Sequence, residues 1–212
     1  MKKILCFGDS NTYGYIPNNG ARYDKNTRWT GVLSLLSHGK FKIIEGGCNN
    51  RTAFAANPAG KIFTGHEILP ELLTDDFDAV VLAIGINDTQ FLFDTVIEDF
   101  TTGIENLINI VQAKCPQAKI ILVAPSILTE DVIRGNFSYQ FDKTSIEKSI
   151  QLPQIYKKIA ENKKIEFFDL NSIVKVSPLD GLHYEPEQHK KIAQAMFAVL
   201  SEVFKNPSKV IG

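Results

Sequence analysis

The stretch DAVVLAIGIND, which runs from Asp78 to Asp88, indicates how this chain folds. Residues 78–84 are almost entirely apolar and do not alternate with polar residues. This pattern is typical of a strand that is covered on both faces, as in a parallel sheet with helices on each side. The polar residues that follow at once, 85–88, should then lie at the carboxyl end of a buried strand.

Four further runs have the character of strands, at residues 3–7, 41–45, 119–124 and 165–170. Helix-length segments lie between and after these runs, at residues 29–37, 65–73, 94–114, 144–162 and 186–204, and Pro70 is expected to break or kink the second of them. Strands that alternate with helices predict an α/β protein: a three-layer, doubly wound sheet of about five parallel strands with helices on both faces. Residues 125–143 have the least regular pattern, so we expect a long loop or a lid over a site there.

Composition and charge limit the classes of protein to consider. The chain has 212 residues, which fits one domain over residues 1–212, and its net charge of -1 without a long basic run argues against a nucleic-acid partner. No apolar stretch reaches the roughly 18 residues of a membrane span, and the amino terminus lacks the pattern of a secretory signal, so we expect a cytoplasmic protein without a membrane partner. The cysteines are three in number, widely spaced and without a CxxC pair. They predict free, mostly buried thiols, and we expect no metal and no other cofactor.

Polar clusters follow the predicted strands. Residues 8–11, 46–51 and 85–88 each come directly after a strand, and residues 180–184 lie in a loop after the last strand. Ligands of open α/β sheets bind at the carboxyl ends of the strands. We therefore expect these four clusters to meet at one edge of the sheet.

One of these clusters, residues 8–11, contains a candidate nucleophile, Ser10. A serine hydroxyl reacts well only when a base takes its proton. Of the four histidines, only His183 has an acidic residue at a spacing that could orient its ring within one loop, because Asp180 stands three residues before it. The residues predict a Ser-His-Asp triad made of Ser10, His183 and Asp180.

Acyl transfer also needs donors for the oxyanion that develops in the transition state. Asn87 offers a neutral side-chain amide for this purpose, and the glycine-rich corner at residues 46–51 could lend a backbone N–H. Taken singly, each of these clusters also fits an ordinary turn or a helix cap. The combination is what indicates acyl-transfer chemistry.

Together the four clusters resemble the SGNH hydrolases, the GDSL-type esterase and lipase superfamily. FGDSNT corresponds to the nucleophile block of that superfamily, EGGCNNRT to the second block, GIND to the G-x-N-D block and DGLH to the D-x-x-H block. More narrowly, ILCFGDSNTYGYIP followed by RWTGVL and DGLHY is similar to a subgroup of arylesterases and acyltransferases. The resemblance implies a flavodoxin-like sheet and a serine hydrolase that cleaves small carboxylic esters, or transfers their acyl group.

The resemblance also implies roles for individual residues. It makes Ser10 the nucleophile, His183 the general base and acid, and Asp180 the residue that orients His183. The implied oxyanion donors are the backbone N–H of Ser10, the side chain of Asn87 and a backbone N–H of the second block, which falls on Asn50 where many members have glycine.

The subgroup extends the expectations to the pocket and to assembly. It places the stretch around Trp29 near the pocket, so Trp29 is interpreted first as a packed aromatic residue and second as a substrate contact. The subgroup also includes assemblies, so the resemblance is compatible with a homo-oligomer, and the sequence leaves the oligomeric state open. The expected partner is a small-molecule ester substrate.

Two other functions are compatible with parts of the pattern. Asp9 could be the nucleophile of a metal-dependent phosphotransferase of the haloacid-dehalogenase type, although Asn11 stands where such enzymes carry a second Asp. A non-catalytic binding protein on the same fold is the other alternative. On the triad interpretation Asp9 is structural, His189 is a solvated helix residue, and residues 91–93 belong to the core or line an acyl pocket.

Overall fold

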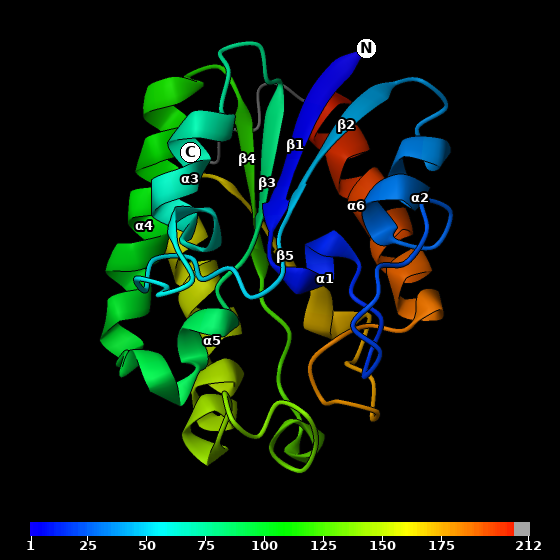
Figure 1. The fold of residues 1–212 in the computed structure, drawn as a ribbon. Helices are drawn as coiled ribbons and strands as arrows, with labels where there is room; N and C mark the ends of the chain where they lie inside the picture. Colours follow the sequence, from blue (N-terminus) through cyan, green and yellow to red (C-terminus); the bar gives the residue numbers. More distant parts are fainter. Residues whose placement is uncertain (206–212) are drawn as a thin grey trace.

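A parallel sheet of five strands forms the centre of the molecule (Figure 1). The computed structural model describes residues 1–205. The strands pair in the order β2-β1-β3-β4-β5, and every pair is parallel. Their bounds are β1 Lys2–Gly8, β2 Phe41–Gly47, β3 Ala79–Ala83, β4 Lys119–Ala124 and β5 Glu166–Asp169.

Helices cover both faces of the sheet (Figure 1). One face carries α2 and α6, and the other carries α3, α4 and α5. Their bounds are α2 Trp29–Leu36, α3 Gly65–Leu72, α4 Ile97–Lys114, α5 Lys143–Lys163 and α6 Pro186–Lys205; a short helix α1, Ser10–Tyr13, follows β1 directly. The prediction of a doubly wound α/β sheet with helices on both faces is confirmed.

The predicted elements differ from the observed ones mainly at their ends. Helix α3 continues through Pro70 rather than breaking there. Helix α4 begins at Ile97 and not at Asp94, because Asp94 is left-handed, with φ of 49°. The carboxylate of Asp99 then accepts a hydrogen bond from the backbone N–H of Val96 and caps the helix.

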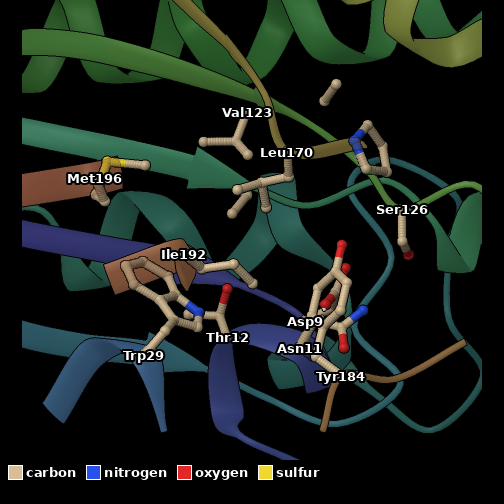
Figure 2. A pocket seen from close by; sticks show the side chains of 13 residues that line it. Asp9, Asn11, Thr12, Trp29, Val123, Ser126, Leu170, Tyr184, Ile192 and Met196 are labelled. Carbon is tan, nitrogen blue, oxygen red and sulfur yellow. Dashed lines mark hydrogen bonds between the residues drawn. The ribbon is translucent and has the colours of Figure 1, made fainter. Parts of the chain in front are cut away.

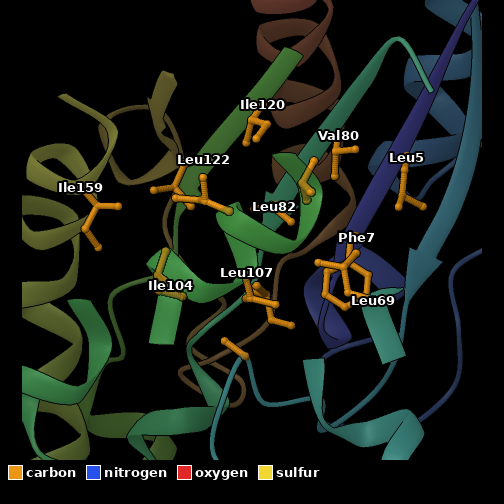
Figure 3. Packing of buried hydrophobic residues seen from close by; sticks show 14 of the residues in the cluster. Leu5, Phe7, Leu69, Val80, Leu82, Ile104, Leu107, Ile120, Leu122 and Ile159 are labelled. Atoms are coloured by element: carbon orange, nitrogen blue, oxygen red, sulfur yellow. The ribbon is translucent and has the colours of Figure 1, made fainter. Parts of the chain in front are cut away.

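The core is divided by the sheet into two layers. Alternate residues of the central strands point to opposite faces. Leu5, Phe7, Val80, Leu82 and Leu122 pack against α3, α4 and α5 (Figure 3). Ile4, Cys6, Val81, Ile121 and Val123 pack toward α2 and α6. Burial of each large side chain stabilises the fold by about 1.5–3 kcal/mol, which explains why these strands read as unbroken apolar runs.

The strand order shows where on the sheet a ligand is expected to bind. The chain leaves β1 toward β2 on one side of the sheet and returns to β3 on the other side. The crevice between the carboxyl ends of β1 and β3 is therefore the topological switch point, where ligands bind in sheets of this order. The short helix α1 follows β1 at this point, and the short 3-10 helix Asn87–Thr89 follows β3.

Residues 125–142 connect β4 to α5 across this edge, so the predicted loop at 125–143 ends one residue early. They contain one 3-10 turn, Glu130–Ile133. Leu128, Val132 and Phe141 form a small apolar cluster with Ile86 and Leu182. The segment is thus a packed cover, while its movement as a lid stays a prediction.

Two further predictions concern the whole chain. Within residues 1–205, no helix has the length and apolar character needed to cross a membrane. Cys6 and Cys115 are buried free thiols, and Cys48 is a half-buried free thiol. The single-domain prediction for 1–212 includes residues 206–212, which lie outside the described part, and it stays a prediction.

Candidate active site

Ser10 lies at the corner between β1 and α1. It is the first residue of α1, and only 4% of its surface is exposed. The carboxylate of Asp9 accepts a hydrogen bond from the backbone N–H of Asn11 at 2.9 Å and caps the helix. The hydrogen bond predicted to hold this corner through Asp9 is therefore present, while the choice of Ser10 over Asp9 as nucleophile stays a prediction.

Three side chains from two distant parts of the chain form a hydrogen-bonded line at this corner. The Nε2 atom of His183 lies 2.9 Å from the Oγ atom of Ser10, and its Nδ1 atom lies 2.8 Å from Oδ2 of Asp180. A carboxylate can only accept, so Nδ1 carries the proton and Nε2 presents a lone pair to the serine hydroxyl. The structure thus brings Ser10, His183 and Asp180 together as the sequence predicts.

Asp180 is held by a turn of its own backbone. Its Oδ1 atom accepts from the N–H groups of Leu182 at 3.1 Å and His183 at 3.0 Å. Burial raises the pKa of Asp180, but the hydrogen bond and charge of His183, together with these N–H donors, lower it overall. Asp180 is therefore ionised at neutral pH and can accept the hydrogen bond that orients His183.

Helix α1 and the loop after it support the triad with contacts that the sequence did not reveal. The side-chain amide of Asn11 donates to the carbonyl of Leu182 at 3.1 Å, and the backbone N–H of Asn18 donates to Oδ2 of Asp180 at 3.1 Å. The ring of Tyr15 stacks on the ring of His183, with centroids 4.2 Å apart. Only the turn-forming character of residues 18–20 could have drawn attention to this loop.

Phe137 from the covering segment completes the surroundings of His183. Its ring centroid lies 5.2 Å from that of His183 and 6.1 Å from that of Tyr15. The imidazole is therefore fixed by aromatic contacts as well as by hydrogen bonds. The sequence predicted a loop near the site here but gave no role to Phe137.

Asn87 and Asn50 lie on the loops after β3 and β2. The Nδ2 atom of Asn87 donates to the carbonyl of Arg51 at 3.0 Å. Asn50 is half-buried and left-handed, with φ of 56°, and its carbonyl accepts from the side chain of Asn57 at 2.9 Å. The buried amide of Gln90 lies between them and donates to both side-chain oxygens, to Asn87 at 2.9 Å and to Asn50 at 2.8 Å. Sequence reasoning missed Gln90.

Asp88 ties these two loops together. Its carboxylate accepts hydrogen bonds from three successive backbone N–H groups, those of Ala53 at 2.6 Å and of Phe54 and Ala55 at 2.9 Å. Burial raises the pKa of Asp88 to about 6, although the three N–H donors favour its charged form. The loop that carries Asn50 is thereby anchored to the loop that carries Asn87.

A small cavity lies next to α1, and Trp29 is one of the residues that line it. Figure 2 shows Trp29, Ile192 and Met196 at its apolar side and Asp9 at its polar side. Trp29 is 3% exposed and belongs to the core under α2 and α6. The structure therefore places Trp29 in internal packing, and Ser10 is not among the residues that line this cavity.

One other sequence interpretation was wrong, and so was one of the two alternatives for a further stretch. His189 is fully buried rather than solvated, because it shares the inner face of α6 with Ile192 and Met196. Its Nδ1 atom accepts from the backbone N–H of Trp29 at 3.3 Å, and burial, with a smaller effect of His183, lowers its pKa to about 4. Residues 91–93 are not core, because they form a short surface turn that ends at the left-handed Asp94, while their alternative role as lining of an acyl pocket stays a prediction.

Comparisons with known proteins agree with this geometry. The sequence pattern of the GDSL-like lipase/acylhydrolase family matches residues 6–191. The structure of the M. smegmatis aryl esterase is similar with a TM-score of 0.88 and 28% identity, over 95% of this chain and 99% of that chain. A carbohydrate acetylesterase from Sinorhizobium meliloti is similar with a TM-score of 0.86 and 28% identity, over 96% of this chain and 100% of that chain. The comparison with curated proteins found no match. Because the family pattern spans most of its length, the chain belongs to the GDSL-like lipase/acylhydrolase family and is a carboxylic ester hydrolase.

Proposed function

We propose that this hydrolase works through an acyl-enzyme formed on Ser10. The observation that carries the proposal is the line from Ser10 Oγ through His183 to Asp180, with separations of 2.9 Å and 2.8 Å. Both distances lie in the range expected for a base and the nucleophile that it activates.

The first half-reaction transfers the acyl group to the enzyme. Ser10 Oγ attacks the carbonyl carbon of the ester while Nε2 of His183 takes the hydroxyl proton. The carbonyl oxygen becomes an oxyanion, and the carboxylate of Asp180 stabilises the imidazolium. His183 then gives its proton to the leaving alkoxide, so that the bond to the alcohol breaks and an ester on Ser10 remains.

The second half-reaction returns the enzyme to its starting state. A water molecule gives a proton to Nε2 of His183 and attacks the acyl carbon. The bond to Ser10 Oγ breaks, the carboxylic acid leaves, and His183 returns the proton to the serine. If an alcohol takes the place of water, the product is a new ester, so the same residues support acyl transfer.

The oxyanion is assigned three donors in this proposal. These are the backbone N–H of Ser10, the backbone N–H of Asn50 and the side-chain amide of Asn87. The left-handed backbone of Asn50 and the hydrogen-bonded amide of Asn87 support the assignment. Donors fixed before the reaction stabilise the transition state without the cost of reorganising solvent.

The proposed substrates are small carboxylic esters. Aryl esters and acetylated carbohydrates are the first classes to test, because the similar M. smegmatis protein is named an aryl esterase and the similar S. meliloti protein a carbohydrate acetylesterase. A panel of p-nitrophenyl esters of increasing acyl length and of acetylated sugars would define the range.

A fluorophosphonate probe tests the nucleophile directly. Intact protein at neutral pH should gain one label, and peptide mass spectrometry should place it on Ser10. Ser10→Ala should take no label and lose about 10⁴–10⁶-fold in kcat on p-nitrophenyl acetate, and His183→Ala a similar amount, because triad members act as a unit. Absence of labelling of the folded wild type would overturn the proposal, and turnover that EDTA abolishes would favour the metal-dependent alternative at Asp9.

A further inference from the structure

Gln90 is a buried glutamine that joins the two asparagines of the proposed oxyanion hole. Its side chain is 1% exposed. Its Nε2 atom donates to Oδ1 of Asn87 at 2.9 Å and to Oδ1 of Asn50 at 2.8 Å. An amide nitrogen has two N–H bonds, so both donors of Gln90 are used on these two oxygens.

The contact with Gln90 decides which way the Asn87 amide points. The oxygen and nitrogen ends of an asparagine amide have nearly the same shape, so packing alone distinguishes them poorly. An N–H of Gln90 can pair only with the oxygen, and the carbonyl of Arg51 can pair only with the nitrogen. A flipped Asn87 would set two donors against each other at Gln90 and two acceptors against each other at Arg51.

The correct orientation leaves one donor of Asn87 for the substrate. One of the two N–H bonds on Nδ2 goes to the carbonyl of Arg51 at 3.0 Å. The second is then left for the oxyanion, while Oδ1 is turned toward Gln90 and away from the developing negative charge. A buried, hydrogen-bonded partner holds this arrangement before substrate binds.

Gln90 also supports the backbone of Asn50. Asparagine enters the left-handed region more readily than most non-glycine residues, but still needs contacts that hold it there. Two hydrogen bonds hold Asn50 in this conformation: its side-chain oxygen accepts from Gln90, and its backbone carbonyl accepts from the side chain of Asn57. The direction of the Asn50 N–H depends on that conformation.

We propose that Gln90 is a positioning residue for ester cleavage: it presets both the Asn87 amide and the Asn50 backbone for the oxyanion. The inference rests on the proposed acyl-enzyme mechanism. Gln90 itself is not assigned a contact with substrate, so its loss should affect the transition state and not substrate binding.

Gln90→Met tests the inference by keeping the length of the side chain and removing both donors. We expect kcat on p-nitrophenyl acetate to fall about 10–100-fold, less than or equal to the roughly 10²–10³-fold effect of losing one oxyanion donor, with KM nearly unchanged. Thr95→Val is the matched control, because its buried hydroxyl donates to the carbonyl of Asp88 in the same loop but to neither asparagine. It should keep the wild-type kcat.

Gln90→Glu provides a pH signature that a merely structural role would not give. A neutral carboxyl can donate one hydrogen bond, whereas a carboxylate can donate none and repels both asparagine oxygens. The ratio of wild-type to Gln90→Glu kcat should therefore rise with pH. Thermal unfolding would show whether Gln90→Met folds poorly. In that case the pH dependence of Gln90→Glu alone tests the inference.

A double-mutant cycle asks whether Gln90 acts through Asn87. Gln90→Met should have a smaller effect in an Asn87→Ala background than in the wild type. The same full effect in both backgrounds, an effect confined to KM, or wild-type kcat in Gln90→Met would each overturn the inference. Failure of the mechanism itself would be distinct, because Ser10 would then take no fluorophosphonate label and Ser10→Ala would keep its turnover.

Discussion

Asp9 is a buried residue beside the proposed nucleophile, and its carboxyl group holds the corner between β1 and α1. Its carboxylate is buried and caps α1 through the N–H of Asn11. Burial, with a smaller effect of the charge on Asp88, raises the pKa of Asp9 from 3.8 to about 7. A carboxyl with a raised pKa in the folded state stabilises the fold at low pH, and this contribution is lost as pH rises through about 7.

Asp9→Asn should therefore flatten the dependence of stability on pH. Asparagine keeps the oxygen that accepts from the N–H of Asn11 but cannot ionise. We expect the free energy of unfolding, measured with urea at pH 5 and pH 8, to fall less with rising pH in Asp9→Asn than in the wild type. Some dependence should persist, because the pKa of Asp88 is also raised, to about 6.

The same variant distinguishes the two candidate nucleophiles. If Ser10 reacts, Asp9→Asn should keep ester cleavage within a few-fold of the wild type, since the cap and the triad are unchanged. Loss of turnover as complete as in Ser10→Ala would show instead that Asp9 takes part in the chemistry.

The sequence could identify residues whose chemistry suits a step of acyl transfer and which follow a predicted strand or lie in a short motif. Asp180 stands three residues before His183, one of only four histidines, and Ser10 follows a predicted strand, so their meeting could be predicted. Tyr15 and Gln90 could not, because stacking and amide orientation depend on the path of loops that no local pattern encodes. Such residues are common in ordinary turns and surfaces, and only their three-dimensional neighbours give them a role.

The turn that carries His183 depends on the segment that covers it. Gly181 has φ of 69°, and a Cβ atom there would lie 2.4 Å from the backbone nitrogen of Val132. The backbone N–H of Thr129 also donates to the carbonyl of Gly181 at 3.2 Å. The turn is thus packed against residues about fifty positions earlier, and a side chain at Gly181 would push the two apart.

Gly181→Ala and Gly39→Ala form a matched pair that measures this packing. Both glycines have positive φ, but a Cβ atom at Gly39 would meet nothing within 4 Å. Gly39→Ala should cost only the backbone strain, about 1–2 kcal/mol. Gly181→Ala should cost about 1–3 kcal/mol more in urea unfolding and should lower kcat, because the turn that holds His183 must shift. Equal stability and full activity in the two variants would contradict close packing of the cover.

Helices and strands could be predicted from the sequence because their apolar residues recur at a regular spacing. The segment that covers the site, residues 125–142, has no such spacing. The strands are unbroken apolar runs and the helices have one apolar face, so each pattern reports its own burial. His189 belonged to such a face, with Ile192 and Met196 at helical spacing, and its polarity concealed that pattern. The cover at residues 125–142 has no period, because it is held by contacts with Leu182 far along the chain.

The two cores of the molecule share one sheet, so we expect them to unfold together. The residues of β1, β3 and β4 alternate between the layer under α3, α4 and α5 and the layer under α2 and α6. The site takes its parts from loops that follow β1, β2, β3 and β5 in the same sheet. A single cooperative unit of this kind should show coincident transitions for structure and for activity.

The only tryptophan of the chain provides the test. Trp29 lies in the layer under α2 and α6, whereas Leu82 is fully buried in the opposite layer. Leu82→Ala should lower the free energy of unfolding by about 2–5 kcal/mol and shift the urea midpoints of Trp29 fluorescence, far-UV circular dichroism and ester cleavage together. Leu92→Ala is the control, since Leu92 is 62% exposed and its truncation should leave the midpoints nearly unchanged. A Trp29 transition that stayed in place while the others moved would mean that the two layers unfold separately, and the shared sheet would then not couple the site to both cores.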